Sequence, residues 1–195
     1  MQNLSVINKQ FIKAAENNQL DELKNLLSHG ADIHANDDMA LKWSAGNGHL
    51  ETVKFLLSQG ASIHVNDDYA LRNSAYGGHL DTVKFLVTKG ANIHADNDSA
   101  LRSSATNGHL DTVKFLCTEG VNIHVNNDEA LRASARRGRL EIVKLLVTRG
   151  ANIHANDDEA LRFFGQNGRH QIPVETNATQ QKQRLTLGNG RNNRH

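Results

Sequence analysis

The sequence predicts an all-α fold in which short helix-turn-helix units stack on one another as a solenoid. One observation is a thirty-residue period, seen most clearly in five glycines: Gly30, Gly60, Gly90, Gly120 and Gly150. Another is that apolar residues recur at helical spacing twice within each period, with a glycine between the two stretches. A fixed period of about 20 to 50 residues is typical of repeat arrays, whose units bury their apolar stripes against their neighbours.

Residues 66–95 show the unit most clearly. The pattern predicts a first helix that begins after Asp68, whose carboxylate can accept hydrogen bonds from the free amides of the first turn. The second helix is predicted to end at Gly90, which can take the left-handed conformation that closes a helix. The expected core positions are Ala70, Leu71, Ser74 and Ala75 on the first helix, and Leu80, Val83, Leu86 and Val87 on the second.

Both structural caps recur with the period. The five glycines above are the expected C-terminal caps of the second helices. The expected N-terminal caps of the first helices are Asp38, Asp68, Asp98, Asp128 and Asp158.

In chain order, we expect a frayed lead over residues 1–6 and a solenoid that ends at residue 168. Its parts are an N-terminal capping repeat (8–30), four full repeats (31–60, 61–90, 91–120 and 121–150) and a half repeat (151–168). Residues 169–195 form a basic tail that is expected to be disordered. Pro173 falls where the missing second helix would run. Phe163 and Phe164 would either cover the open end or dock a partner, and end-to-end association of an otherwise monomeric chain is also open.

The repeated motif Ala-Leu-Arg-x-Ser-Ala-x-x-Gly-His-Leu-Asp-Thr-Val-Lys-Phe-Leu-x-x-x-Gly-Ala-x-Ile resembles the ankyrin repeat. Two features differ from that family: its Thr-Pro pair is absent, and the unit is shorter than the usual length of about 33 residues. The missing residues would lie just before the periodic Asp cap, so a short loop should replace the family's β-hairpin finger. The Asn-Asp-Asp sequence of that loop also resembles the loops of ankyrin proteins in mimivirus-like giant DNA viruses of amoebae.

Bulk composition narrows the functional classes. The formal net charge of +1 does not point to a nucleic-acid-binding protein, and the single Cys117 excludes an internal disulfide. The sequence shows neither a signal-peptide pattern nor a run of eighteen apolar residues. We therefore expect a soluble protein of the cytoplasm that does not bind membranes.

Two histidine series invite a metal-binding or enzymatic interpretation. One lies in the loops (His34, His64, His94, His124 and His154), and the other in the turns between helices (His49, His79 and His109). Neighbouring repeats are about 10 Å apart, whereas a zinc ion needs ligands at about 2 Å, so one series cannot converge on one ion. Structural roles are therefore expected, with no catalytic residue, metal or cofactor, and the chain is not expected to be an enzyme.

A basic residue also recurs on the first helix, for which ion pairing with the nearby Asp residues is expected. The series is Lys42, Arg72, Arg102, Arg132 and Arg162.

The ankyrin resemblance implies a protein-interaction scaffold that binds a host or viral protein through its concave face. Scaffold positions repeat, so the positions that vary are free to carry recognition. The candidate partner-binding residues are Trp43, Tyr69, Tyr76, Glu129, Arg136 and Arg137. Trp43 could equally pack between layers. Alternatives are nucleic-acid binding through Arg136, Arg137, Arg139 and the tail, a metal or enzymatic role for the His and Asp series, and a non-functional duplicate.

Overall fold

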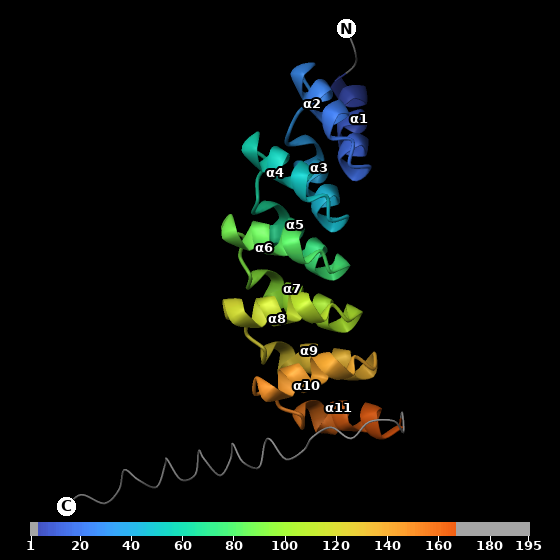
Figure 1. Ribbon diagram of the computed structural model, residues 1–195, viewed down its shortest axis with the longest axis vertical. Helices are drawn as coiled ribbons and strands as arrows, with labels where there is room; N and C mark the ends of the chain where they lie inside the picture. Colours follow the sequence, from blue (N-terminus) through green and yellow to red (C-terminus); the bar gives the residue numbers. More distant parts are fainter. Residues whose placement is uncertain (1–3, 167–195) are drawn as a thin grey trace, which may run out of the picture. The chain divides into compact units, whose positions relative to one another are not determined.

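The computed structural model describes residues 4–166, and its regular secondary structure over this range consists of eleven α-helices without a strand (Figure 1). The helices are α1 (Leu4–Glu16), α2 (Leu20–Ser28), α3 (Ala35–Gly46), α4 (Leu50–Ser58), α5 (Val65–Gly77), α6 (Leu80–Thr88), α7 (Ala95–Asn107), α8 (Leu110–Glu119), α9 (Val125–Arg136), α10 (Leu140–Thr148) and α11 (Ala155–Gln166). The prediction of an all-α chain of helix pairs with short loops is confirmed.

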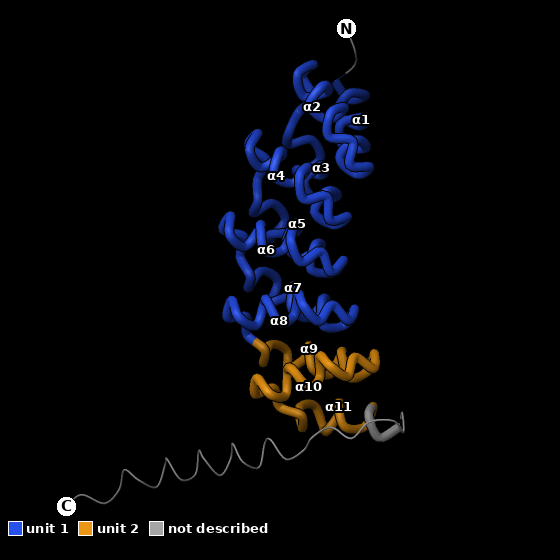
Figure 2. Tube along the Cα trace, viewed as in Figure 1, with its two compact units in different colours: residues 1–122 blue, residues 123–195 orange. Residues whose placement is uncertain are grey.

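The chain divides into two compact units, residues 1–122 and 123–195 (Figure 2). Unit 1 contains α1 to α8, and the described part of unit 2 contains α9 to α11. The boundary falls in the connector of the predicted 121–150 repeat, inside the predicted 1–168 solenoid. The predicted tail lies outside the described residues.

Within unit 1, the first helices of successive repeats form the main contact layer. Helix α3 packs against both α1 and α5, and α5 packs against α7. Each of these helices also contacts the helix that follows it, while α6 contacts α4 and α8 less extensively. In unit 2, α9 packs against α10 and α11. Unit 1 is therefore a stack of neighbouring helix pairs, and the described part of unit 2 is one helix pair with α11 packed against it.

The first-helix stripe is buried as predicted, and the second-helix stripe only in part. Ala70 and Leu71 are buried on α5, where small side chains allow close helix approach. On α6, Val83 and Leu86 are buried, whereas Leu80 and Val87 are only half-buried; the prediction that all four face the core is wrong. The sparse contacts among the second helices explain this difference, because the flanks of their stripes stay partly open.

The N-terminal end differs from the expected frayed lead. Helix α1 begins at Leu4, and Ile7 on its inner side is 2% exposed. The apolar residues before the predicted start of the first repeat therefore extend its first helix.

Each repeat from α3 onward contains three consecutive residues in the left-handed region. These are residues 36–38, 66–68, 96–98, 126–128 and 156–158, all of them Asn or Asp, with φ between 48° and 61°. Asn and Asp are the residues other than glycine that tolerate this region best. The Asn and Asp residues thus specify a tight left-handed turn. This differs from the expected loop with an ordinary N-terminal cap.

Candidate functional site

The periodic Asp carboxylates connect adjacent repeats. Asp68 is 4% exposed, and its Oδ1 accepts hydrogen bonds from His64 Nδ1 at 3.0 Å and from the backbone N–H of Asn92 at 3.0 Å. We expected the carboxylate to accept from the first turn of its own helix, but these partners are a preceding histidine and the connector of the next repeat. The physical reason is the left-handed turn, which places Asp68 in a non-helical conformation at φ 52°.

The same bridge recurs along both units. In each case a backbone N–H donates to the Asp Oδ1: Ser62 to Asp38 at 2.9 Å, Asn122 to Asp98 at 3.0 Å and Asn152 to Asp128 at 3.0 Å. At the N-terminal end, the Asn8 side-chain oxygen accepts from the backbone N–H of Asp32 at 2.8 Å, in the same register. Asn8 stands thirty residues before Asp38, so the same period already places it at the position of the bridging carboxylate. For Asp158, the residue 24 positions further on lies outside the described part.

Both histidine series are engaged in structural hydrogen bonds. In the loop series, each ring Nδ1 pairs with an Asp carboxylate, for example His94 with Asp98 at 2.9 Å. In the turn series, Nε2 of His79 donates to the Gly46 carbonyl at 2.9 Å, and Nε2 of His109 donates to the Tyr76 carbonyl at 2.8 Å. Among residues 4–166, no group of three His, Cys, Asp or Glu side chains is placed to hold a metal ion.

The basic series closes the left-handed turns. Arg72 donates from Nε to the Asp67 carbonyl and from Nη2 to the Asn66 carbonyl, both at 2.8 Å. Its Nη1 also meets Asp96 Oδ2 at 3.1 Å. Arg132 makes the corresponding bonds in unit 2 and pairs with Glu159. The expected ion pairing therefore occurs, but its carboxylates are outside the periodic Asp series.

The predicted partner-binding residues fall into separate groups. Trp43 on α3 and Tyr69 and Tyr76 on α5 are exposed by 42%, 40% and 59%, and all three belong to unit 1. Arg136 and Arg137 are exposed and belong to unit 2.

The polar candidates of unit 2 are partly engaged within their own unit. Arg136 Nη2 lies 3.4 Å from Glu159 Oε1, and its guanidinium carbon lies 6.0 Å from the half-buried Phe163 ring. Glu129 accepts a hydrogen bond from Asn126 Nδ2 at 3.1 Å. A hydrogen bond from Asn156, with further contributions from Arg132 and Arg136, lowers the pKa of the Glu159 carboxyl against an opposing effect of burial. The Phe164 side chain lies outside the described residues.

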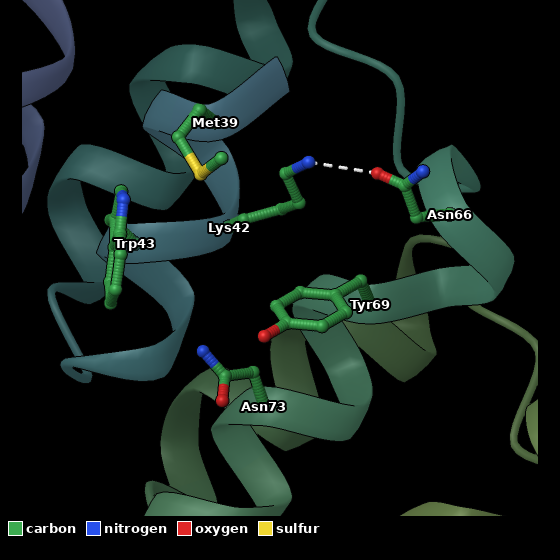
Figure 3. Close-up of a pocket in the computed structure, with 6 residues that line it drawn as sticks. All are labelled: Met39, Lys42, Trp43, Asn66, Tyr69 and Asn73. Atoms are coloured by element: carbon green, nitrogen blue, oxygen red, sulfur yellow. Dashed lines mark hydrogen bonds between the residues drawn. The ribbon is translucent and has the colours of Figure 1, made fainter. Parts of the chain in front are cut away.

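A pocket of about 350 Å³ opens between α3 and α5 (Figure 3). Its lining residues are Met39, Lys42, Trp43, Asn66, Tyr69 and Asn73. Lys42 extends across it, and its Nζ donates to Asn66 Oδ1 at 2.8 Å, as Figure 3 shows. The pocket thus joins two predicted residues, Trp43 and Tyr69. Lys42 and Asn66 were not among the predicted site residues, although Lys42 is the one lysine in a series that otherwise consists of arginines.

A protein-family profile described as "Ankyrin repeats (3 copies)" matches residues 10–67 and 71–157. The chain belongs to the ankyrin-repeat family. A search of curated proteins found no match to this ankyrin chain. Ankyrin repeats are generally protein–protein interaction modules and are typically non-enzymatic, so a protein partner is implied. Within the described ankyrin repeats, every helix is too short or too polar to span a membrane.

Proposed function

We propose that this ankyrin-repeat protein binds a partner protein through the solvent-facing side of α3 and α5. The observation that supports the proposal most strongly is the exposure of Trp43, Tyr69 and Tyr76 on these neighbouring helices. Leu4 and Val6, at the start of α1, are the other large apolar side chains exposed in the described part. Trp and Tyr are enriched among residues that dominate binding energy at protein interfaces.

Unit 2 contributes differently from the expectation. Arg137 is exposed and remains a candidate contact in this proposal. Arg136 already meets Glu159, so a partner would have to compete with an existing ion pair. The same ion pair weakens the nucleic-acid alternative, because it neutralises part of the positive charge on which that alternative depends.

The proposed partner is a host or viral protein that the chain meets in the cytoplasm. This part of the proposal follows from the resemblance of the Asn-Asp-Asp repeats to ankyrin proteins of giant DNA viruses.

Affinity capture from lysates of candidate host cells, with quantitative mass spectrometry, tests the proposal. The full chain would be compared with a Trp43→Ala/Tyr76→Ala double variant and with Lys84→Ala, a control on the exposed side of α6. We expect one saturable partner whose capture falls at least about ten-fold in the double variant, which corresponds to roughly 1.4 kcal/mol. Capture by the control variant should be unchanged, and circular dichroism should show that all three proteins are folded.

Two results would contradict the proposal. One is a partner retained equally by the double variant, which would place the interface elsewhere. The other is the lack of any saturable partner across candidate lysates, which would favour a non-functional duplicate.

A further inference from the structure

The pocket between α3 and α5 holds a buried positive charge. Lys42 is 7% exposed, and its Nζ donates to two neutral oxygens, Asn66 Oδ1 at 2.8 Å and the Asn36 carbonyl at 3.4 Å. Within residues 4–166, no carboxylate forms an ion pair with Lys42. Lysine is rarely buried this deeply unless it is paired with an opposite charge, because desolvation penalises the ammonium group.

The neighbouring repeat shows what this position lacks. Arg72 stands thirty residues after Lys42, and its Nη1 meets the Asp96 carboxylate at 3.1 Å. Asp96 stands thirty residues after Asn66, so the two residues occupy the same repeat position. The partner of the basic residue at this position is a carboxylate for Arg72 and a neutral amide for Lys42. The neutral amide of Asn66 lines the pocket between α3 and α5.

The acids of α3 do not compensate for this difference. Asp38, one helical turn before Lys42, already accepts hydrogen bonds from His34 Nδ1 and from the Ser62 backbone. On the other side of the pocket, the Tyr69 ring lies 5.9 Å from Lys42 Nζ and 5.4 Å from Arg72 Cζ. The aromatic wall is therefore flanked by two cations, of which Arg72 has a carboxylate partner and Lys42 has none among residues 4–166.

We propose that this pocket binds a segment of the partner protein in which a large apolar side chain is adjacent to Asp or Glu. The apolar side chain enters between Trp43 and Tyr69, and the adjacent carboxylate pairs with the Lys42 ammonium. This inference rests on the proposed function and specifies the chemistry of the partner. The volume of about 350 Å³ is at the lower end of the range for ligand pockets, about 300–1,000 Å³, and suits one or two side chains.

A protein segment with an apolar and an acidic side chain would complement both the apolar lining and the charge of the pocket. The aromatic and thioether groups of Trp43, Tyr69 and Met39 form the apolar lining, and the ammonium lies within reach of the same space (Figure 3). A hydrogen bond to a charged group is among the stronger polar contacts, so an acidic residue gains more than its amide analogue.

The test uses short random peptides displayed on phage and selected against the folded full chain. Enriched peptides would then be synthesised in matched pairs, one with Glu beside the apolar residue and the other with Gln in its place. Binding would be measured for the wild type, Lys42→Met and Asn66→Asp. Lys42→Met keeps most of the stem without its charge, and Asn66→Asp supplies the missing carboxylate within the chain. Asn126→Asp makes the identical change at the same repeat position in unit 2, as the matched control.

We expect enrichment of an acidic residue beside a large apolar residue. The Glu peptide should bind the wild type roughly ten- to hundred-fold more tightly than the Gln peptide, the range for a hydrogen bond to a charged group. This preference should disappear in Lys42→Met and Asn66→Asp and persist in Asn126→Asp. Asn66→Asp should melt no lower than the wild type, because it pairs a buried charge.

The remaining outcomes overturn the inference and separate it from the proposed function. Peptides that bind without acidic preference, and are lost in the Trp43→Ala/Tyr76→Ala variant, would leave the proposed interface intact and remove the role of Lys42. If selection enriches no peptide more strongly on the wild type than on Asn66→Asp, the proposal that the pocket binds an acidic segment is refuted. Binding of free phenylacetate that depends on Lys42, without binding of any peptide, would assign the pocket to a small carboxylate instead.

Discussion

Replacement of Asp68 by alanine should destabilise unit 1 far more than the same replacement of its neighbour Asp67. Both residues lie in the left-handed turn, at φ 52° and 61°, so both variants place alanine in the same unfavourable backbone region. The Asp68 side chain is buried and bonded to the next repeat, whereas Asp67 is exposed. The difference between the variants therefore isolates the contribution of the carboxylate bridge.

The magnitude follows from the two hydrogen bonds. The bond from the Asn92 N–H to the buried carboxylate should contribute about 1.5–3 kcal/mol, the range for a charged acceptor. The His64 side chain is 62% exposed, so its pairing with Asp68 is screened by solvent and adds about 0.5 kcal/mol or less. Asp68→Ala should thus lower the free energy of unfolding by about 2–3 kcal/mol more than Asp67→Ala.

Urea unfolding monitored by far-ultraviolet circular dichroism measures this difference. Asp68→Asn should give an intermediate loss, since the amide oxygen can still accept from the backbone but carries no charge. Equal free energies of unfolding for Asp68→Ala and Asp67→Ala, within about 0.5 kcal/mol, would refute the bridge as a stabilising contact.

Three further predictions concern other contacts. Gly48→Ala should cost about 2–3 kcal/mol, because φ is +74° and the new Cβ would lie 2.4 Å from the His79 ring, whereas Gly60→Ala meets open space and should cost about 1 kcal/mol in thermal melts. Glu159 has a lowered pKa in the folded state, so its stabilisation is present above its ordinary value of 4.5 and is lost as pH falls further. The stability difference between wild type and Glu159→Gln should therefore shrink below that pH, and a constant difference in pH-dependent unfolding would contradict this. Arg72→Lys cannot bond both turn carbonyls, so it should cost about 1–2 kcal/mol and speed amide exchange over residues 66–68.

The repeat pattern predicts the helices well because periodicity reports burial directly. The thirty-residue spacing, the small first-helix stripe and the absence of strands over residues 4–166 all follow from residues that act within one unit. The role of Asp68 was predicted less well. Asn and Asp favour both helix caps and left-handed turns, so composition alone does not distinguish the two.

The pocket was harder to predict because it depends on contacts between two neighbouring repeats. Exposed aromatic residues at variable positions identified Trp43 and Tyr69. The significance of Lys42 emerges only when its partner is known to lie 24 residues further along the chain, where Asn66 is neutral and its equivalent in the next repeat, Asp96, is a carboxylate. Sequence periodicity gives the length of the repeat but not the register at which one repeat contacts the next.

That register has an evolutionary consequence. The Asp bridge joins residues 24 apart, and the turn histidine reaches back 33 residues, so each contact is defined by position relative to a neighbouring copy. If residues 61–90 were excised, the Asn92 amide would follow Asp38 by 24 residues, as the Ser62 amide does now. His109 would likewise follow Gly46 by 33 residues, as His79 does now. Duplication of one repeat would restore the same bonds at each new junction. Recombination between copies can therefore lengthen or shorten this array by whole repeats and keep these spacings, whereas an insertion of another length changes the spacing of every bonded pair that flanks it.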